Sequence, residues 1–221
     1  MINQIITGDC TATLRTLPAE SIDMALTDPP YGVRYRDRHG RGIANDDDLA
    51  PVLASFPELY RVLKPDSIAI CFYGWNRIGE FWPAWIAAGF RPIGHLVWHK
   101  GYASSARFLE ARHEQAYLLA KGRPRPPPAP LPDVQPWEYS GNRFHPTEKD
   151  VRILKPLVRA FCPRRGTVID PFAGSGSTAV AAALTGRQYI GIELEAHYCE
   201  HARRRLAGAA RQLARFRQLT Q

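Results

Sequence analysis

Short runs of apolar, often β-branched residues alternate along the chain with segments in which apolar positions recur at helical spacing. This alternation is typical of a mostly parallel sheet covered by helices on both faces, so the pattern predicts an α/β fold. Strands are expected at residues 5–7, 22–26, 67–73, 93–98, 114–120, 167–169 and 189–192. Helices are expected at residues 49–63, 75–88, 151–161 and 177–184, with a basic helix after residue 193.

A proline-rich segment interrupts this alternation, because seven of the thirteen residues 124–136 are proline. Proline donates no backbone hydrogen bond and stiffens the chain, so we expect an extended surface linker here and no core element. A connecting strap is favoured over a ligand for an SH3-type domain, since such composition is common in linkers. The length of 221 residues fits one domain, divided into residues 1–121, 122–144 and 145–221.

The net charge of +8 favours a polyanionic partner, nucleic acid first, although a well-solvated arginine-rich surface explains it equally well. The four cysteines lie far apart and form no Cys-x-x-Cys pair, so neither a metal site nor a disulfide framework is predicted. The N-terminus lacks the features of a signal peptide, and no apolar run approaches the ~20 residues of a membrane span. These features predict a cytoplasmic protein that does not bind membranes.

The first motif with a chemical role is Asp28-Pro29-Pro30-Tyr31, which follows a predicted strand, where doubly wound sheets bind ligands. An aryl amine is a poor nucleophile because its lone pair is delocalised into the ring. Acceptors aimed at the two amino protons stabilise the positive charge that develops on nitrogen as the amine attacks. The Asp28 carboxylate and the Pro29 carbonyl are such acceptors, and Tyr31 offers a face for a base swung out of its stack. The alternative is an ordinary turn, since proline and aspartate are common turn formers.

The second motif is a glycine-rich loop, residues 170–178, between a predicted strand and a predicted helix. Glycines allow a tight turn and close ligand approach, and the amides of a helix N-terminus favour an anionic group. Glu193 ends the next strand, seventeen residues after Gly176, where its carboxylate can accept hydrogen bonds from both ribose hydroxyls of an adenosyl group. The spacing Gly174-x-Gly176-x-x-Ala179 also fits a dinucleotide fingerprint, so this loop alone leaves NAD and adenosyl cofactors open.

Together the two motifs resemble a known family. Asp-Pro-Pro-Tyr followed about 140 residues later by Asp-Pro-Phe-x-Gly-Ser-Gly is similar to the amino-methyltransferases of DNA in their β arrangement, in which the catalytic half precedes the cofactor half. An NAD enzyme explains none of the first half. Further matches run in the same order over nearly the whole chain: Gly8-Asp9-Cys10 with Leu14, Val97-Trp98-x-Lys100, Arg112-His113-Glu114 and His145-Pro146-Thr147-Glu148-Lys149.

The resemblance implies a single doubly wound, Rossmann-like methyltransferase domain whose mostly parallel, seven-stranded sheet has one antiparallel strand. Residues 1–121 would then be the catalytic half and residues 145–221 the cofactor-binding half. Residues 122–144 would be the proline-rich linker and a candidate target-recognition segment.

The resemblance also implies roles for individual residues, with S-adenosylmethionine as the cofactor. Residues 28–31 match the catalytic tetrad, Asp9 a position that reaches the cofactor adenine, and Thr147 and Lys149 positions near the methionine carboxylate. Asp150 departs from the family, which usually has proline after this lysine, but aspartate is a good residue for a helix start. The residues expected to bind the cofactor are Asp9, Asp28, Thr147, Lys149, Asp170, Phe172, Gly174, Ser175, Gly176, Thr178 and Glu193.

DNA is the expected partner, and N6 of adenine the expected target. Aspartate at the first tetrad position resembles the adenine group, whereas serine is more usual among cytosine-N4 enzymes. The alternatives are methylation of cytosine N4, methylation of an RNA base, and a non-catalytic DNA-binding module. The resemblance mildly favours a homodimer, and the chain specifies neither a target sequence nor a paired restriction enzyme. Most basic side chains at such interfaces contact phosphate and not bases. The candidate DNA contacts are Arg34, Arg36, Arg38, Arg41, Lys100, Arg107 and Arg143.

Overall fold

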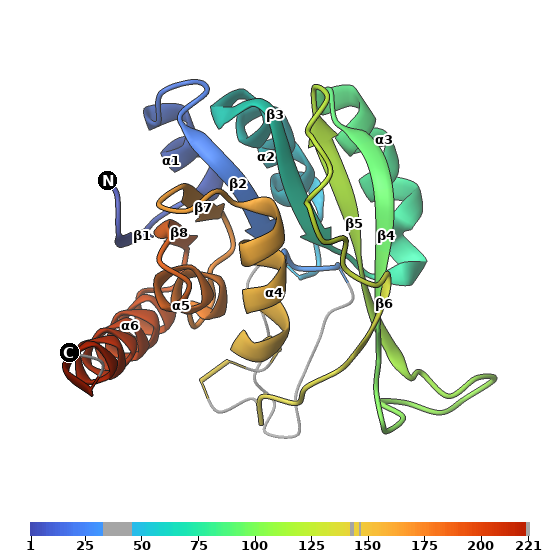
Figure 1. The fold of residues 1–221 in the computed structure, drawn as a ribbon. Coiled ribbons are helices and arrows are strands. Elements are labelled where there is room, and N and C mark those ends of the chain that lie inside the picture. The colour runs from blue at the N-terminus through green and yellow to red at the C-terminus, as the bar shows by residue number, and fades with distance from the viewer. Residues whose placement is uncertain (33–45, 142–143, 146, 220–221) are drawn as a thin grey trace.

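One sheet forms the centre of the computed structural model, which describes residues 1–32, 46–141, 144–145 and 147–219. The described residues contribute eight strands in the spatial order β1-β8-β7-β2-β3-β5-β4-β6 (Figure 1). All neighbours are parallel except that β5 runs antiparallel to both β3 and β4. The mostly parallel sheet with one antiparallel strand is therefore confirmed. The strands are β1 (Gln4–Thr7), β2 (Ile22–Thr27), β3 (Leu63–Phe72), β4 (Arg91–His99), β5 (His113–Lys121), β6 (Val134–Pro136), β7 (Thr167–Asp170) and β8 (Gln188–Glu193).

The strand β6 corrects the expectation of seven strands, because it lies inside the segment predicted to be a linker. It pairs in parallel with the edge of β4, with Val134 opposite Val97. Two backbone hydrogen bonds flank the pairing, from Val97 N to Asp133 O at 2.8 Å and from Trp137 N to His99 O at 2.9 Å. Proline is compatible with this position because an edge strand offers only one side of its backbone to the sheet. The proline-rich segment therefore stays at the surface but closes one edge of the sheet.

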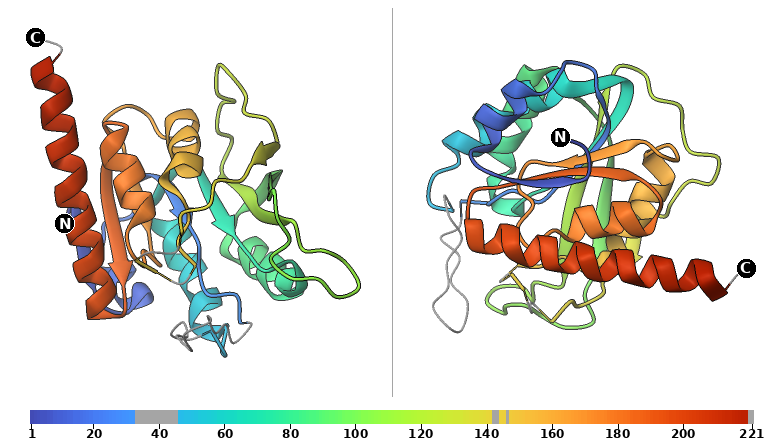
Figure 2. Two further views of the ribbon diagram at one scale, coloured as in Figure 1. Left: turned by 90° about the horizontal axis from the view of Figure 1, so that it is seen from below. Right: turned by 90° about the vertical axis from the view of Figure 1, so that its left-hand side faces the viewer.

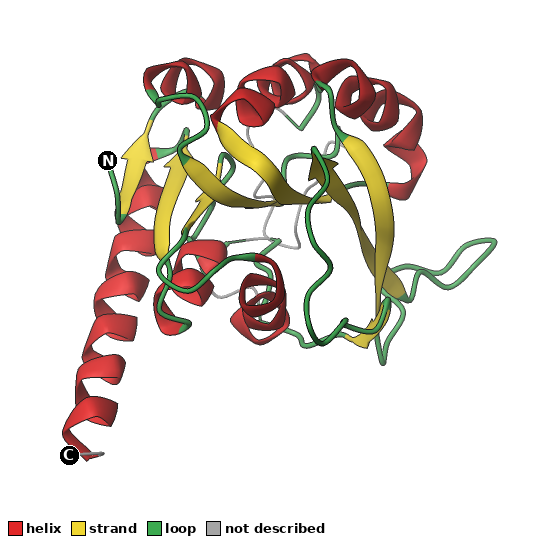
Figure 3. Cartoon of the chain, turned by 45° about the horizontal axis from the view of Figure 1, so that its top comes forward, coloured by secondary structure: helices red, strands yellow, loops and turns green. Residues whose placement is uncertain are grey.

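Helices cover both faces of the sheet (Figure 3). A hydrophobic core lies on each face of the sheet. Successive side chains of β2 point into opposite cores, because Ala25 packs on one face and Met24 and Leu26 pack on the other. Burial on both faces explains why the strands are continuous apolar runs. On one face lie α1 (Cys10–Thr16), α2 (Ala50–Val62) and α3 (Ile78–Ala88), which follows the 3-10 turn η1 (Trp75–Arg77). On the other lie α4 (Val151–Phe161), α5 (Ser177–Leu184) and α6 (Ala196–Leu219).

Aspartate side chains cap two of these helices. Asp9 accepts a hydrogen bond from Ala12 N at 2.7 Å at the start of α1, a helix of seven residues that the apolar period is too short to predict. Asp150 accepts one from Arg152 N at 2.7 Å at the start of α4. A side-chain acceptor at this position satisfies a backbone donor that has no partner within the helix. The departure from the family pattern at Asp150 therefore leaves the helix start intact, as expected.

The basic C-terminal helix α6 packs on α5 through Ala202, Leu206 and Ala209. Its far end projects from the body of the domain (Figure 2). In the part of the chain that the structure describes, no helix has both the length and the apolar character that crossing a membrane requires.

The parallel strands bring the two chemical motifs to one edge of the sheet. β2 lies between β7 and β3, and the three strands run in the same direction. Asp28 follows the last residue of β2, and Asp170 is the last residue of β7. Segments about 140 residues apart in the sequence therefore meet at the carboxyl ends of neighbouring strands, where folds of this class bind their ligands.

Candidate active site

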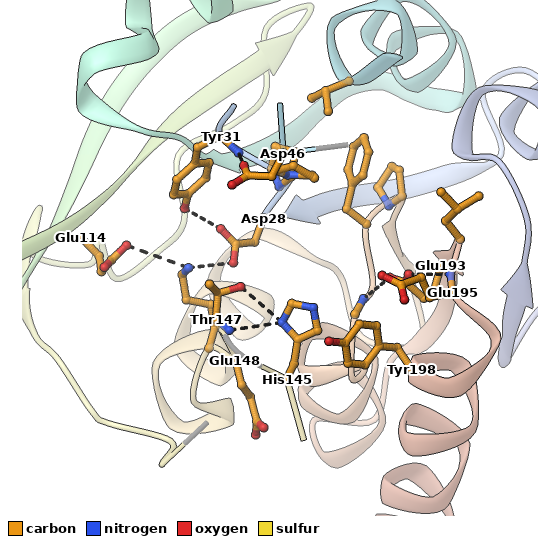
Figure 4. A pocket seen from close by; sticks show the side chains of 18 of the residues that line it. Asp28, Tyr31, Asp46, Glu114, His145, Thr147, Glu148, Glu193, Glu195 and Tyr198 are labelled. Carbon is orange, nitrogen blue, oxygen red and sulfur yellow. Dashed lines mark hydrogen bonds and ion pairs between the residues drawn. The ribbon is translucent and has the colours of Figure 1, made fainter. Parts of the chain in front are cut away.

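A cavity of about 970 Å³ opens at this edge of the sheet and is lined by both motifs. The tetrad at residues 28–31 lines it from β2, and Phe172, Gly174 and Glu193 line it from β7 and β8. Figure 4 shows Asp28 and Tyr31 on one side of this space and Glu193 on the other. The meeting of the two motifs, which the sequence could only imply, is thus a feature of the structure.

Both carboxylate oxygens of Asp28 accept hydrogen bonds. The Tyr31 hydroxyl donates to Oδ1 at 2.6 Å, and Lys149 Nζ donates to Oδ2 at 2.7 Å (Figure 4). Burial raises the pKa of Asp28 above its ordinary value, although the Lys149 ammonium opposes this. Burial and the Asp28 charge also raise the pKa of Tyr31 well above its ordinary value, so its hydroxyl keeps its proton and acts as the donor.

Lys149 belongs to a buried chain of alternating charges. Its ammonium lies between Asp28 and Glu114, whose Oε2 is 3.9 Å from Nζ, and Glu114 in turn pairs with Lys100. Burial acts to lower the pKa of Lys149, but the two carboxylates outweigh it and raise that pKa. Burial likewise acts to raise the pKa of Glu114, and the two ammonium groups outweigh it and lower that pKa. Lys149 thus pairs with Asp28 and also lines the cavity, where the resemblance implies a place near the methionine carboxylate.

Asp46 fixes the backbone of the tetrad and is not among the predicted site residues. It is only 3% exposed, and its Oδ1 accepts hydrogen bonds from Tyr31 N at 2.9 Å and Gly32 N at 2.8 Å. In the sequence it begins the acidic run Asp46-Asp47-Asp48, and such runs are ordinarily solvated. Its contact with residues some fifteen positions earlier exists only in the folded chain.

Glu193 organises the glycine-rich loop through main-chain contacts. Its Oε2 accepts a hydrogen bond from Gly174 N at 2.8 Å, and its Oε1 accepts one from Glu195 N at 2.9 Å. Burial raises the pKa of Glu193. Each carboxylate oxygen has a further lone pair, so the group can still accept hydrogen bonds from a ligand in the cavity.

Gly176 has a structural reason to be glycine. It adopts a left-handed conformation with φ of 83° at the start of α5, and a Cβ atom there would lie 2.7 Å from Ala202 Cβ on α6. The loop is also tied to α6 by Arg205, whose guanidinium donates to Ser175 Oγ at 2.7 Å and pairs with Glu148 at 3.1 Å. Helix α6 therefore supports the loop from behind.

The predicted cofactor residues divide into two groups. Thr178 donates its hydroxyl to Leu26 O at 3.4 Å, and burial raises the pKa of Asp170 to about 7, so both are interior groups. Gly176 lines neither the main cavity nor the adjoining space of about 50 Å³. The main cavity is lined by Asp9, Asp28, Thr147, Lys149, Phe172, Gly174 and Glu193. Asp170, Ser175 and Thr178 line only the adjoining space of about 50 Å³.

The segment that precedes α4 is held by His145. Thr147 N donates to His145 Nδ1 at 3.3 Å, and the imidazole packs against Tyr198 with ring centroids 4.4 Å apart. His145 thereby orients Thr147 toward the cavity (Figure 4).

The predicted DNA contacts lie in different surroundings. Lys100 is 5% exposed and lines the cavity beside Glu114, and Arg107 is exposed on the loop between β4 and β5. Tyr102 and Tyr139 form an edge-to-face pair at the cavity, with ring centroids 5.9 Å apart. Part of the cavity lining is therefore aromatic, and Tyr139 contributes to it from the segment 122–144 that was predicted to be a linker. Arg34, Arg36, Arg38, Arg41 and Arg143 lie outside the described residues.

Comparison with known proteins covers most of the chain. Residues 22–204 match the family model of the N6 and N4 type that is described as DNA methylase. The chain is 51% identical to YubD of Escherichia coli (strain K12), which is named as a methylase, over 95% of this chain and 92% of that protein. It is 28% identical to the DNA adenine methyltransferase YhdJ of the same organism, over 91% of this chain and 82% of that protein.

Solved structures share the fold at lower identity. The structure of M1.HpyAVI in complex with SAM superposes with a TM-score of 0.73 at 21% sequence identity. The similarity covers 92% of this chain and 98% of that one. The overall fold of this chain is therefore the same as that of M1.HpyAVI.

Proposed function

This chain belongs to the DNA methylase family, and on that premise we propose that it transfers a methyl group from S-adenosylmethionine to N6 of adenine in DNA. One observation carries the proposal. The amine-activating tetrad and the adenosyl-binding loop line a single cavity of about 970 Å³, although they are about 140 residues apart in the sequence. This volume lies at the upper end of the range for small-molecule sites, as a site for a cofactor and a base together requires.

The residues around the cavity fit the cofactor. Glu193 has lone pairs left for the ribose hydroxyls, Asp9 and Phe172 line the region for the adenine, and Thr147 offers a hydroxyl to the methionine carboxylate. When bound, S-adenosylmethionine supplies a methyl group on a positively charged sulfur, which an amine can attack. Lys149 is engaged by Asp28, so its charge acts on the tetrad.

The tetrad acts on the amine. The Asp28 carboxylate and the Pro29 carbonyl accept hydrogen bonds from the two amino protons. These hydrogen bonds stabilise the positive charge that develops on nitrogen. Tyr31 provides the stacking face for the flipped base. Its hydroxyl bond to Asp28 and its N–H bond to Asp46 fix the ring before any ligand binds, so little ordering remains for the reaction.

Adenine is favoured over cytosine by two facts. The first position of the tetrad is aspartate, as in the adenine group, and the relative YhdJ is named a DNA adenine methyltransferase. Cytosine N4 carries the same type of exocyclic amine, so the chemistry of the tetrad alone does not choose between the two bases.

The test is a product analysis. The protein is incubated with labelled S-adenosylmethionine and unmethylated DNA, or with RNA as a control, and the nucleic acid is then hydrolysed to nucleosides. Label in N6-methyldeoxyadenosine is the expected result. Label only in N4-methyldeoxycytidine would overturn the choice of base, and transfer to RNA alone or to no nucleic acid would overturn the function.

Glu193→Ala is expected to weaken binding of S-adenosylmethionine by about 1–3 kcal/mol, because charge-assisted hydrogen bonds to the ribose are lost. Isothermal titration calorimetry measures this directly. Glu200→Ala, an exposed glutamate of α6, is the matched control and should bind as the unsubstituted protein does. An unchanged dissociation constant for Glu193→Ala, or micromolar binding of NAD, would contradict the assignment of this site to S-adenosylmethionine.

A further inference from the structure

A hairpin extends from the sheet between β4 and β5 (Figures 1 and 3). Backbone hydrogen bonds continue the pairing of the two strands, from Lys100 N to Arg112 O at 2.7 Å and from Ser104 N to Ala111 O at 2.9 Å. An isolated antiparallel bridge between residues 106 and 110 closes it. The segment 100–112 is therefore an ordered protrusion with a defined tip at residues 107–109.

The tip presents two large apolar side chains to solvent. Phe108 is 103% exposed and Leu109 is 84% exposed. Arg107 precedes them, and its side chain is exposed too. Adjacent, fully exposed Phe and Leu side chains at the end of a protrusion have nothing to pack on within the described domain, so the fold itself does not account for them.

The base of the same hairpin belongs to the active site. Lys100 and residues 102–105 line the cavity that the tetrad borders. Phe108 follows Ser105 by three positions, which an extended chain spans in about 10 Å. Phe108 therefore lies no more than about 10 Å from a residue that lines the cavity.

We propose that Phe108 and Leu109 form a wedge that enters the DNA duplex beside the target base and occupies the space which that base leaves when it swings into the cavity. The inference rests on the proposed function, because only an enzyme that flips a base leaves such a gap. Phe and Leu are among the side chains that insert between base steps in other DNA-binding proteins, and Arg107 stands where it can contact a phosphate. A second copy of this chain is the rival occupant of the tip.

The first experiment compares methyl transfer to unmethylated duplex DNA and to the same DNA after heat denaturation. Phe108→Ala is expected to lower transfer to duplex DNA by at least about 10-fold, and to change transfer to denatured DNA by no more than about 2-fold, since unstacked bases need no wedge. Phe108→Trp should keep most of the duplex activity. Ile86→Ala, at an exposed apolar position of α3 that belongs neither to the hairpin nor to the cavity lining, should change neither rate. Undiminished transfer to duplex DNA, or equal loss on both substrates, would overturn the proposal.

A thiol readout tests the position of the tip without relying on turnover. All four native cysteines are buried, so Phe108→Cys introduces an exposed thiol that iodoacetamide can label selectively. Duplex DNA together with S-adenosylhomocysteine should slow labelling at position 108 by at least about 10-fold and leave Ile86→Cys unaffected. Labelling that DNA does not slow would overturn the wedge. So would a change from dimer to monomer in Phe108→Ala on size-exclusion chromatography, because the tip would then be an interface between copies. Failure of the unsubstituted protein to methylate any DNA would instead refute the proposed function.

Discussion

Asp28→Ala is expected to lower the single-turnover rate of methyl transfer by at least ~100-fold, as loss of a preorganised polar group does in other enzymes. The reason is that the carboxylate stabilises a positive charge that develops on the amine mainly in the transition state. Binding of S-adenosylmethionine should change much less, because Glu193 and the glycine-rich loop lie on the other side of the cavity (Figure 4). Rapid-quench measurement with enzyme in excess over DNA gives the rate of the chemical step.

One control measurement and one companion variant separate chemistry from folding. Among the described residues, Asp28→Ala leaves Lys149 with Glu114 as its one carboxylate neighbour, at 3.9 Å, so thermal unfolding must show that the variant is folded. Tyr31→Phe removes one hydrogen bond to Asp28 but keeps the stacking ring, and it should retain substantial activity. If Asp28→Ala is folded, binds the cofactor and still methylates DNA near the unsubstituted rate, the proposed mechanism is wrong.

The same carboxylate sets a pH dependence. Asp28 must be unprotonated to accept hydrogen bonds from the amine, and burial raises its pKa. The rate is therefore expected to fall with decreasing pH as the carboxylate protonates, and to do so at a higher pH than an exposed aspartate would give. A rate that stays constant down to the ordinary pKa of aspartate would contradict the role assigned to Asp28.

Lys149→Met is expected to lower the free energy of unfolding by about 3–5 kcal/mol at pH 7, the usual result of removing one partner from a buried ion pair. The substitution keeps much of the side-chain volume but leaves Asp28 and Glu114 buried without the cation between them. Lys64→Met removes an ammonium whose side chain is 45% exposed, and its partner Asp23 keeps a hydrogen bond from Thr167 N, so that control should cost no more than about 1 kcal/mol. Urea unfolding monitored by circular dichroism measures both.

The loss from Lys149→Met should shrink in acid. The pKa of Glu114 is lowered in the folded protein, so its contribution to stability is present above its ordinary pKa and is lost as the pH falls through the lowered value. The difference between the two proteins is thus largest near neutral pH. A loss below about 1 kcal/mol at pH 7 would mean that the charges are better solvated than their burial indicates.

The sequence predicted the strands that a two-sided core requires, because continuous apolar runs such as that of β3 record burial on both faces. It missed α1 and β6, since seven residues and three residues are too short to display a period. The tetrad and Glu193 could be predicted as candidate site residues because their chemistry is restrictive, and the structure places them around one cavity. The role of Asp46 and the pairing of Lys149 with Asp28 could not be predicted from the sequence. Both depend on contacts between distant segments, and the sequence around a single aspartate or lysine does not indicate which residue it will contact.

The position of β8 and β7 between β1 and β2 has a consequence for biosynthesis. β1 leaves the ribosome first, but its partner β8 is made more than 180 residues later, at Gln188–Glu193. At ordinary rates of translation the first strand waits roughly 10–40 s for that partner. β2 likewise pairs with β7, so the carboxyl ends of these strands are not assembled until β7 and β8 have been made. An apolar strand left unpaired for that time is open to association with other nascent chains. We therefore expect the yield of active protein to depend on chaperones that cover the N-terminal strands during synthesis.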